Sequence, residues 1–113
     1  KTELLKVFAS LTVTESTRVI VKLIILPSKS YLQEITLSKD LIDVLKQEEN
    51  IEEITFVGLC TDICVISNVM VVKAFYPEIP LVVDALGCAG VTVQSHLNAL
   101  EAMKMCQVKV VNE

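Results

Sequence analysis

The stretch that decides the fold is GLCTDICV, residues 58–65. It follows the β-branched run Ile54–Val57, which predicts a buried strand. It leads into Ile63–Phe75, a segment without a helix breaker in which apolar side chains recur at helical spacing. A strand that turns directly into a helix is typical of alternating α/β folds.

The same reasoning extends to both sides of this junction. Pro27 ends a run of β-branched residues, and Ser38 and Thr92 are candidate N-caps. We therefore predict further strands at Arg18–Leu26, Leu81–Val83 and Val108–Val111, and further helices at Lys39–Glu49 and Val93–Met105 with Leu97, Leu100 and Met103 facing inward. Residues 28–36 and 86–91 are predicted loops, and residues 1–16 show no clear period.

This order of elements predicts an α/β fold in which a mainly parallel sheet is flanked by helices in three Rossmann-like layers. Ligands of such open sheets bind beyond the carboxyl ends of the strands. That rule indicates the segments Gly58–Cys64, Asp84–Val91 and Pro27–Tyr31.

Composition narrows the class of protein. The chain has 113 residues, of which 52% are hydrophobic and 21% charged, so we expect a single domain over residues 1–113. A net charge of −4 and 4% aromatic residues disfavour nucleic-acid binding. No apolar run approaches the roughly 18 residues that span a bilayer, and no signal peptide is evident, so we expect a cytoplasmic protein without membrane contact.

The cysteines and the histidine argue against metal and disulfide chemistry. The spacing of the four cysteines does not form the paired knuckles of a zinc site, and so apolar a chain needs no disulfides. A single histidine, His96, cannot supply a site made of several imidazoles. The acidic cluster Glu48–Glu53 is typical of a solvated surface turn.

Cys64 is the candidate nucleophile. It lies at the start of a predicted helix, where unpaired amides and the helix dipole favour a thiolate and can stabilise an oxyanion. The alternative is a small buried core cysteine without chemical function. Asp62 is predicted to cap the helix and to fix the turn before it.

Three segments resemble the isochorismatase-like cysteine hydrolases, and the nicotinamidases in particular. They are GLCTDICVISN, KAFYPEIPLVVDALGCAGVT and SHLNALEAMKMCQ, and the resemblance covers residues 54–112. It implies an α/β fold and a Cys–Lys–Asp triad with Cys64 as nucleophile. It also implies a cis Leu59–Cys60 peptide bond and an oxyanion hole formed by the amides of Cys60 and Cys64, with Gly58 and Thr61 as structural positions of the motif.

The triad lysine is assigned from the resemblance and from chain order. Lys29, in a loop after a predicted strand, is the first candidate, and Lys22, inside that strand, is the second. An ammonium group near the thiol would favour the thiolate and could relay protons. His96 matches a helix position of the family that is not a metal ligand, and we expect it to be solvated or capping.

The sequence departs from the family in its N-terminal part. All of its aspartates (Asp40, Asp43, Asp62 and Asp84) follow Lys29, whereas the family's triad aspartate ends the first strand. The family's metal-binding Asp-x-His motif is also missing, so we expect no metal in this chain, although the full-length family can hold a divalent, zinc-like ion. Residues 1–30 match poorly. The chain is therefore interpreted as lacking the N-terminal part of the fold, or as a degenerate relative.

The predicted function is cysteine-dependent amide hydrolysis, with nicotinamide and water giving nicotinate and ammonia through an acyl-enzyme on Cys64. One alternative is a catalytically inactive module kept for binding or assembly. Another is a different hydrolase of the superfamily, acting on an isochorismate-type ether or a carbamoyl amide. The expected partners are a small-molecule amide and further copies of the chain, because an incomplete sheet leaves an unpaired edge.

Overall fold

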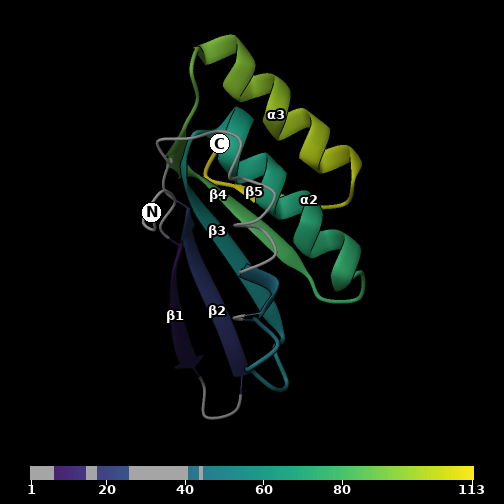
Figure 1. Cartoon of the computed structure of the whole chain (residues 1–113). Helices are drawn as coiled ribbons and strands as arrows, with labels where there is room; N and C mark the ends of the chain where they lie inside the picture. The colour runs from purple at the N-terminus through teal and green to yellow at the C-terminus, as the bar shows by residue number, and fades with distance from the viewer. Residues whose placement is uncertain (1–6, 15–17, 26–40, 44) are drawn as a thin grey trace.

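A computed structural model describes residues 7–14, 18–25, 41–43 and 45–113. One five-stranded sheet has the order β1-β2-β3-β4-β5 (Figure 1). The strands are β1 (Val7–Thr14), β2 (Arg18–Ile25), β3 (Glu53–Leu59), β4 (Leu81–Ala89) and β5 (Lys109–Val111). The described residues also form the π turn η2 (Thr61–Val65), α2 (Ile66–Phe75) and α3 (Val93–Met105), and residues 41–43 and 45 are helical as well.

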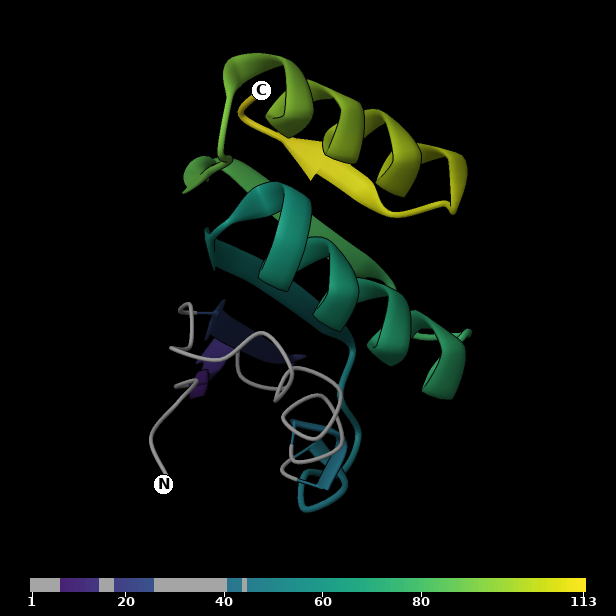
Figure 2. The same ribbon diagram turned by 45° about the horizontal axis from the view of Figure 1, so that its top comes forward.

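The sheet is parallel from β2 to β5, and only β1 runs antiparallel to its neighbour. Because β3, β4 and β5 follow one another in the same direction, right-handed crossovers place both connecting helices on the same face. Figures 1 and 2 show α2 and α3 side by side on that face. The predicted fold class, a mainly parallel α/β sheet with flanking helices, is confirmed.

The hydrophobic core lies between the sheet and these helices. Side chains of β3 alternate, with Ile54 and Phe56 buried and Thr55 and Val57 partly exposed. This alternation is what a strand with one face on the core requires. Apolar residues from each layer complete the core: Val21, Leu23, Ile25, Val65, Val69, Val72, Leu81, Val83, Leu100 and Met103.

Most predicted elements are found close to their predicted bounds. The helix predicted at 63–75 starts as η2 and continues directly into α2, and the helix predicted at 93–105 is α3. Thr92 caps α3 as predicted, because its hydroxyl accepts from the Ser95 amide and the Ser95 side chain accepts from the Thr92 amide.

The structure differs from the sequence analysis at four places. Strand β1 lies in residues 1–16, for which no element was predicted, and it pairs with β2. The loop predicted at 86–91 is in part strand, since β4 runs to Ala89 and pairs again with the end of β3 after an irregularity. Leu97 is 41% exposed and does not face the core.

The fourth difference concerns the helix predicted at 39–49. Its described residues 41–43 and 45 are helical, but a turn follows at residues 46–47. The Glu48 amide donates to the Leu45 carbonyl at 3.0 Å, and Asn50 has φ 61°. A tightened last turn and a left-handed residue are common ends of a helix. Ser38 and the loop predicted at 28–36 lie outside the described residues.

Candidate functional site

The elbow between β3 and α2 begins at a glycine that no other residue can replace without strain. Gly58 has φ 141°, and a Cβ built on it would lie 1.9 Å from the carbonyl oxygen of Ile25 in the neighbouring strand. Only a residue without a side chain allows the two backbones to approach so closely. The predicted role of Gly58 as a structural motif position is consistent with this geometry.

The peptide bond between Leu59 and Cys60 is cis, at the position where the family resemblance places such a bond. After it the chain forms the π turn η2. The carbonyl oxygen of Cys60 accepts hydrogen bonds from the amides of Ile63 at 3.1 Å and Val65 at 3.0 Å. These two hydrogen bonds to one carbonyl group connect the cis peptide bond to the first turn of η2.

Two polar side chains support the junction between η2 and α2. The Ser67 hydroxyl donates to the Ile63 carbonyl at 2.6 Å, and the buried Asn68 amide donates to the Cys64 carbonyl at 2.7 Å. A π turn shifts the helical hydrogen-bond pattern, so side-chain donors one turn later stabilise its carbonyls. These bonds explain why polar residues interrupt an otherwise apolar helix.

Cys64 lies in the first turn of the helical segment formed by η2 and α2. The positive end of the helix dipole is at this turn, which favours an anionic sulfur. The Cys64 side chain is only 2% exposed and belongs to the core cluster. The residue thus combines the position expected of a nucleophile with the burial expected of a core cysteine.

Thr61 and His96 join the elbow to α3. Thr61 is fully buried, and its Oγ1 lies 2.7 Å from Nδ1 of His96 in the first turn of α3. His96 was expected to be solvated or capping; its ring is partly buried, and Nδ1 contacts the threonine hydroxyl. This contact joins residues far apart in the sequence, so no local pattern indicates it.

Asp62 provides a second link to the same segment. Both of its carboxylate oxygens accept from the Val91 amide at 3.3 Å. A hydrogen bond from Ser95 is the main reason that the pKa of Asp62 lies below its usual value. The prediction that Asp62 caps the helix was wrong, since Cys60 is the N-cap and Asp62 reaches across to the β4–α3 connection. Its predicted role in fixing the elbow is consistent with these bonds.

Neither candidate lysine is placed at this site by the structure. Lys29 lies outside the described residues. Lys22 is exposed in the middle of β2, opposite Thr55, while its neighbours Val21 and Leu23 are buried. It therefore lies on the face of the sheet away from the core and from Cys64, so the structure does not bring Lys22 to the elbow.

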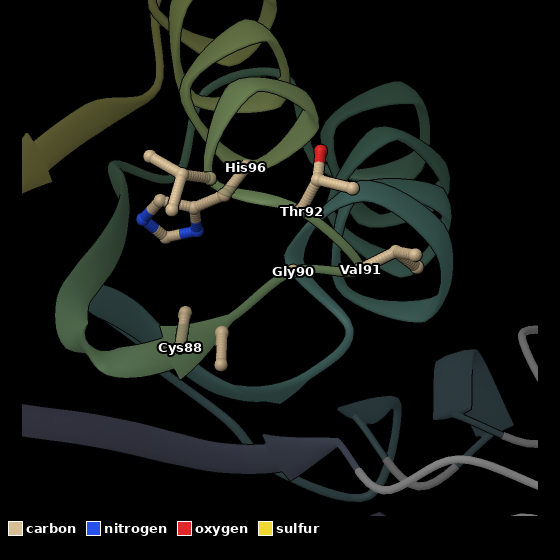
Figure 3. A pocket seen from close by; sticks show the side chains of 7 residues that line it. Cys88, Gly90, Val91, Thr92 and His96 are labelled. Atoms are coloured by element: carbon tan, nitrogen blue, oxygen red, sulfur yellow. The ribbon is translucent and has the colours of Figure 1, made fainter.

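A pocket lies beside the elbow. The sequence indicated only the segment in which it lies, not the individual residues that line it. It has a volume of about 470 Å³ and is lined by residues 88–93 and His96 (Figure 3). It lies at the carboxyl end of β4, one of the three positions indicated by the strand-end rule. Cys88 lines it, and burial raises the pKa of that thiol. Cys64 is not among the lining residues.

Over residues 7–14, 18–25, 41–43 and 45–113, no three histidine, cysteine, aspartate or glutamate side chains gather so that they could hold a metal ion. None of the helices in the same residues is long and apolar enough to cross a bilayer.

Comparison with known proteins identifies the family. A family model described as the isochorismatase domain matches residues 2–112. The chain belongs to the isochorismatase family. No curated protein sequence matches it significantly.

Two solved structures resemble this family member. The nicotinamidase SaPncA from Staphylococcus aureus is 31% identical over 61% of this chain and 44% of its own, with a TM-score of 0.51. The nicotinamidase/pyrazinamidase PncA from Bacillus subtilis is 30% identical over 63% of this chain and 38% of its own, with a TM-score of 0.53. The chain thus matches less than half the length of either protein.

Proposed function

We propose that this isochorismatase-family chain is a cysteine-dependent amide hydrolase of the nicotinamidase type, with Cys64 as its nucleophile. The position of Cys64 supports the proposal: it occupies the first helical turn after the elbow that follows β3. The likeness to two nicotinamidases at 30–31% identity adds the substrate class.

The proposed reaction starts when the Cys64 thiolate bonds to the carbonyl carbon of nicotinamide. The carbonyl electron pair moves to oxygen, where the amides of Cys60 and Cys64 stabilise the charge. Cleavage of the C–N bond follows, and the leaving nitrogen takes a proton from the Lys29 ammonium and departs as ammonia. Water then cleaves the thioester to nicotinate and restores the thiolate. Of the two protons released, one returns to Lys29 and the other converts ammonia to ammonium.

A catalytically inactive binding module is the second candidate. Two observations favour it: Cys64 is only 2% exposed, and every aspartate of the chain follows Lys29. Loss of one member of a catalytic triad typically slows hydrolysis by several powers of ten. A hydrolase of the same superfamily with another substrate is the third candidate.

Ammonia release from nicotinamide separates these candidates. We expect the wild-type chain to release ammonia, Cys64→Ser to lose at least about a thousandfold of that rate, and the exposed-site control Cys106→Ser to keep it. Mass spectrometry after iodoacetamide treatment provides a second readout of Cys64. A wild-type chain that releases no ammonia and alkylates Cys64 no faster than its other thiols would support the inactive module instead.

A further inference from the structure

The pocket beside the elbow has no role in the proposed hydrolysis. Its volume of about 470 Å³ lies within the range of roughly 300–1,000 Å³ that is typical of small-molecule sites. It lies between the end of β4 and the first turn of α3, and His96 is the one titratable side chain besides Cys88 among its lining residues.

The hydrogen bond between Thr61 and His96 determines where the imidazole carries its proton. Thr61 is fully buried, and among the described residues its hydroxyl has no hydrogen-bond partner other than Nδ1 of His96, at 2.7 Å. A buried hydroxyl hydrogen without an acceptor is costly, so the hydroxyl donates to Nδ1. A neutral ring that accepts at Nδ1 carries its hydrogen on Nε2.

The Nε2–H group is then a donor available to a ligand. None of the described residues accepts a hydrogen bond from it, and no buried polar side-chain atom among them is left without a partner, so Nε2 is in contact with solvent. Figure 3 shows the ring of His96 extending from α3 into the pocket, opposite Cys88. Ala89, Val91 and Val93 add apolar lining around this donor.

The charges around the pocket select a neutral ligand. No lysine or arginine is among its lining residues. The Asp62 carboxylate lies behind it and accepts from the Val91 amide at 3.3 Å. The Cys88 thiol donates to the Asp84 carbonyl at 3.4 Å. An uncompensated carboxylate ligand would face the negative charge of Asp62, whereas a neutral carbonyl would not.

We propose that this pocket binds a small neutral carbonyl compound, whose carbonyl oxygen accepts a hydrogen bond from Nε2–H of His96. This site is distinct from Cys64, so the inference stands whether or not the chain hydrolyses amides.

The first test reads the position of the proton. His96 is the only histidine of the chain, so its ¹⁵N resonances need no assignment. In the neutral ring of ¹⁵N-labelled protein we expect a protonated Nε2 and an unprotonated Nδ1, and a mixture of both tautomers in Thr61→Val. A neutral wild-type ring with its proton on Nδ1 would overturn the inference.

The second test measures binding of benzamide, with benzoate as the charged control. We expect saturable shifts of the His96 ring signals with benzamide and at least tenfold weaker binding of benzoate. Cys64→Ser should bind benzamide like the wild type. Equal affinity for benzoate, or loss of benzamide binding in Cys64→Ser, would contradict the proposed site.

Two substitutions of His96 separate a direct contact from a structural role. In His96→Gln the amide reaches the position of Nε2, and in His96→Asn it reaches only the position of Nδ1. By ligand-observed saturation transfer, we expect His96→Gln to bind within about twofold of wild type and His96→Asn about three- to tenfold more weakly, the effect of one neutral hydrogen bond. Equal weakening in both variants, at equal melting temperatures, would assign His96 a structural role and overturn the proposal.

Discussion

Replacing Gly58 by alanine tests the backbone geometry on which the elbow depends. With φ at 141°, a Cβ on residue 58 would lie 1.9 Å from the carbonyl oxygen of Ile25, 2.7 Å from its carbonyl carbon and 2.8 Å from its nitrogen. All three atoms belong to the backbone of β2. No rotation of a side chain can therefore relieve the clash, and β2 and β3 must move apart.

These distances determine roughly how much Gly58→Ala lowers the free energy of unfolding. To reach the 3.0 Å below which real Cβ contacts are essentially never found, the shortest contact must lengthen by about 1.1 Å. This separation would break the pairing of Ile25 with Gly58 at the end of β2. One or two lost backbone hydrogen bonds at about 1 kcal/mol each, with about 1–3 kcal/mol for the strained φ, give a loss of about 2–5 kcal/mol. That is a large part of the roughly 5–15 kcal/mol by which domains of this size are stable.

Urea denaturation followed by circular dichroism measures the free energy of unfolding, and Gly87→Ala is the matched control. A Cβ on Gly87 would meet Cγ1 of Val57 at 2.7 Å, which is a side-chain atom that can shift, and Gly87 has no positive φ. We expect Gly87→Ala to cost about 1 kcal/mol. If Gly58→Ala lies within about 1 kcal/mol of that control, the close approach of β2 to Gly58 is refuted.

Three further predictions concern the hydrophobic core, the loss of stability at acidic pH and the reactivity of the thiols. Leu100→Ala should lower the free energy of unfolding by about 2–5 kcal/mol and the more exposed Leu97→Ala by less than about 1, as urea denaturation of both variants would show. Hydrogen bonding holds the pKa of Asp62 below its usual 3.8, so the unfolded chain binds the extra proton as the pH falls. The melting temperature of Asp62→Asn should therefore fall less steeply than that of the wild type between about pH 5 and pH 2.5, and parallel curves would contradict the role of this carboxylate. Burial raises the pKa of Cys88, so iodoacetamide at neutral pH should modify it more slowly than the exposed Cys106, with equal rates in urea; mass spectrometry of peptides would show the order.

The elements that sequence reasoning located well are those determined by local pattern. Ile54–Val57 is a β-branched run that ends at a glycine, the segment after the elbow is too long without a breaker for a typical strand, and Thr92 begins α3 with a capping residue. Pro27 marked the end of the second strand within two residues of its observed last residue, Ile25. In each case neighbouring residues alone determine the structure, so a single sequence is enough.

The features that it missed depend on partners distant in the sequence. Strand β1 is an exception, because its partner β2 follows it directly in the sequence. The end of β4 depends on a second pairing with β3 after an irregularity. The contact of Thr61 with His96 spans 35 positions. The role of Lys29 remains a prediction, because that residue lies outside the described part of the chain.

The elbow that carries Cys64 is fixed from two sides by different means. On the side of β2 the contact is between backbones and depends on the missing side chain of Gly58. On the side of α3 it is polar: Thr61 bonds to His96, and Asp62 to the Val91 amide. A backbone contact constrains where the strand ends, whereas the polar bonds constrain how the first helical turn is oriented. A nucleophile needs both constraints, because its distance to a substrate and its direction of attack must both be set before reaction. A core cysteine needs neither, since packing alone would hold it, and this difference favours the catalytic interpretation of the elbow over the inert one.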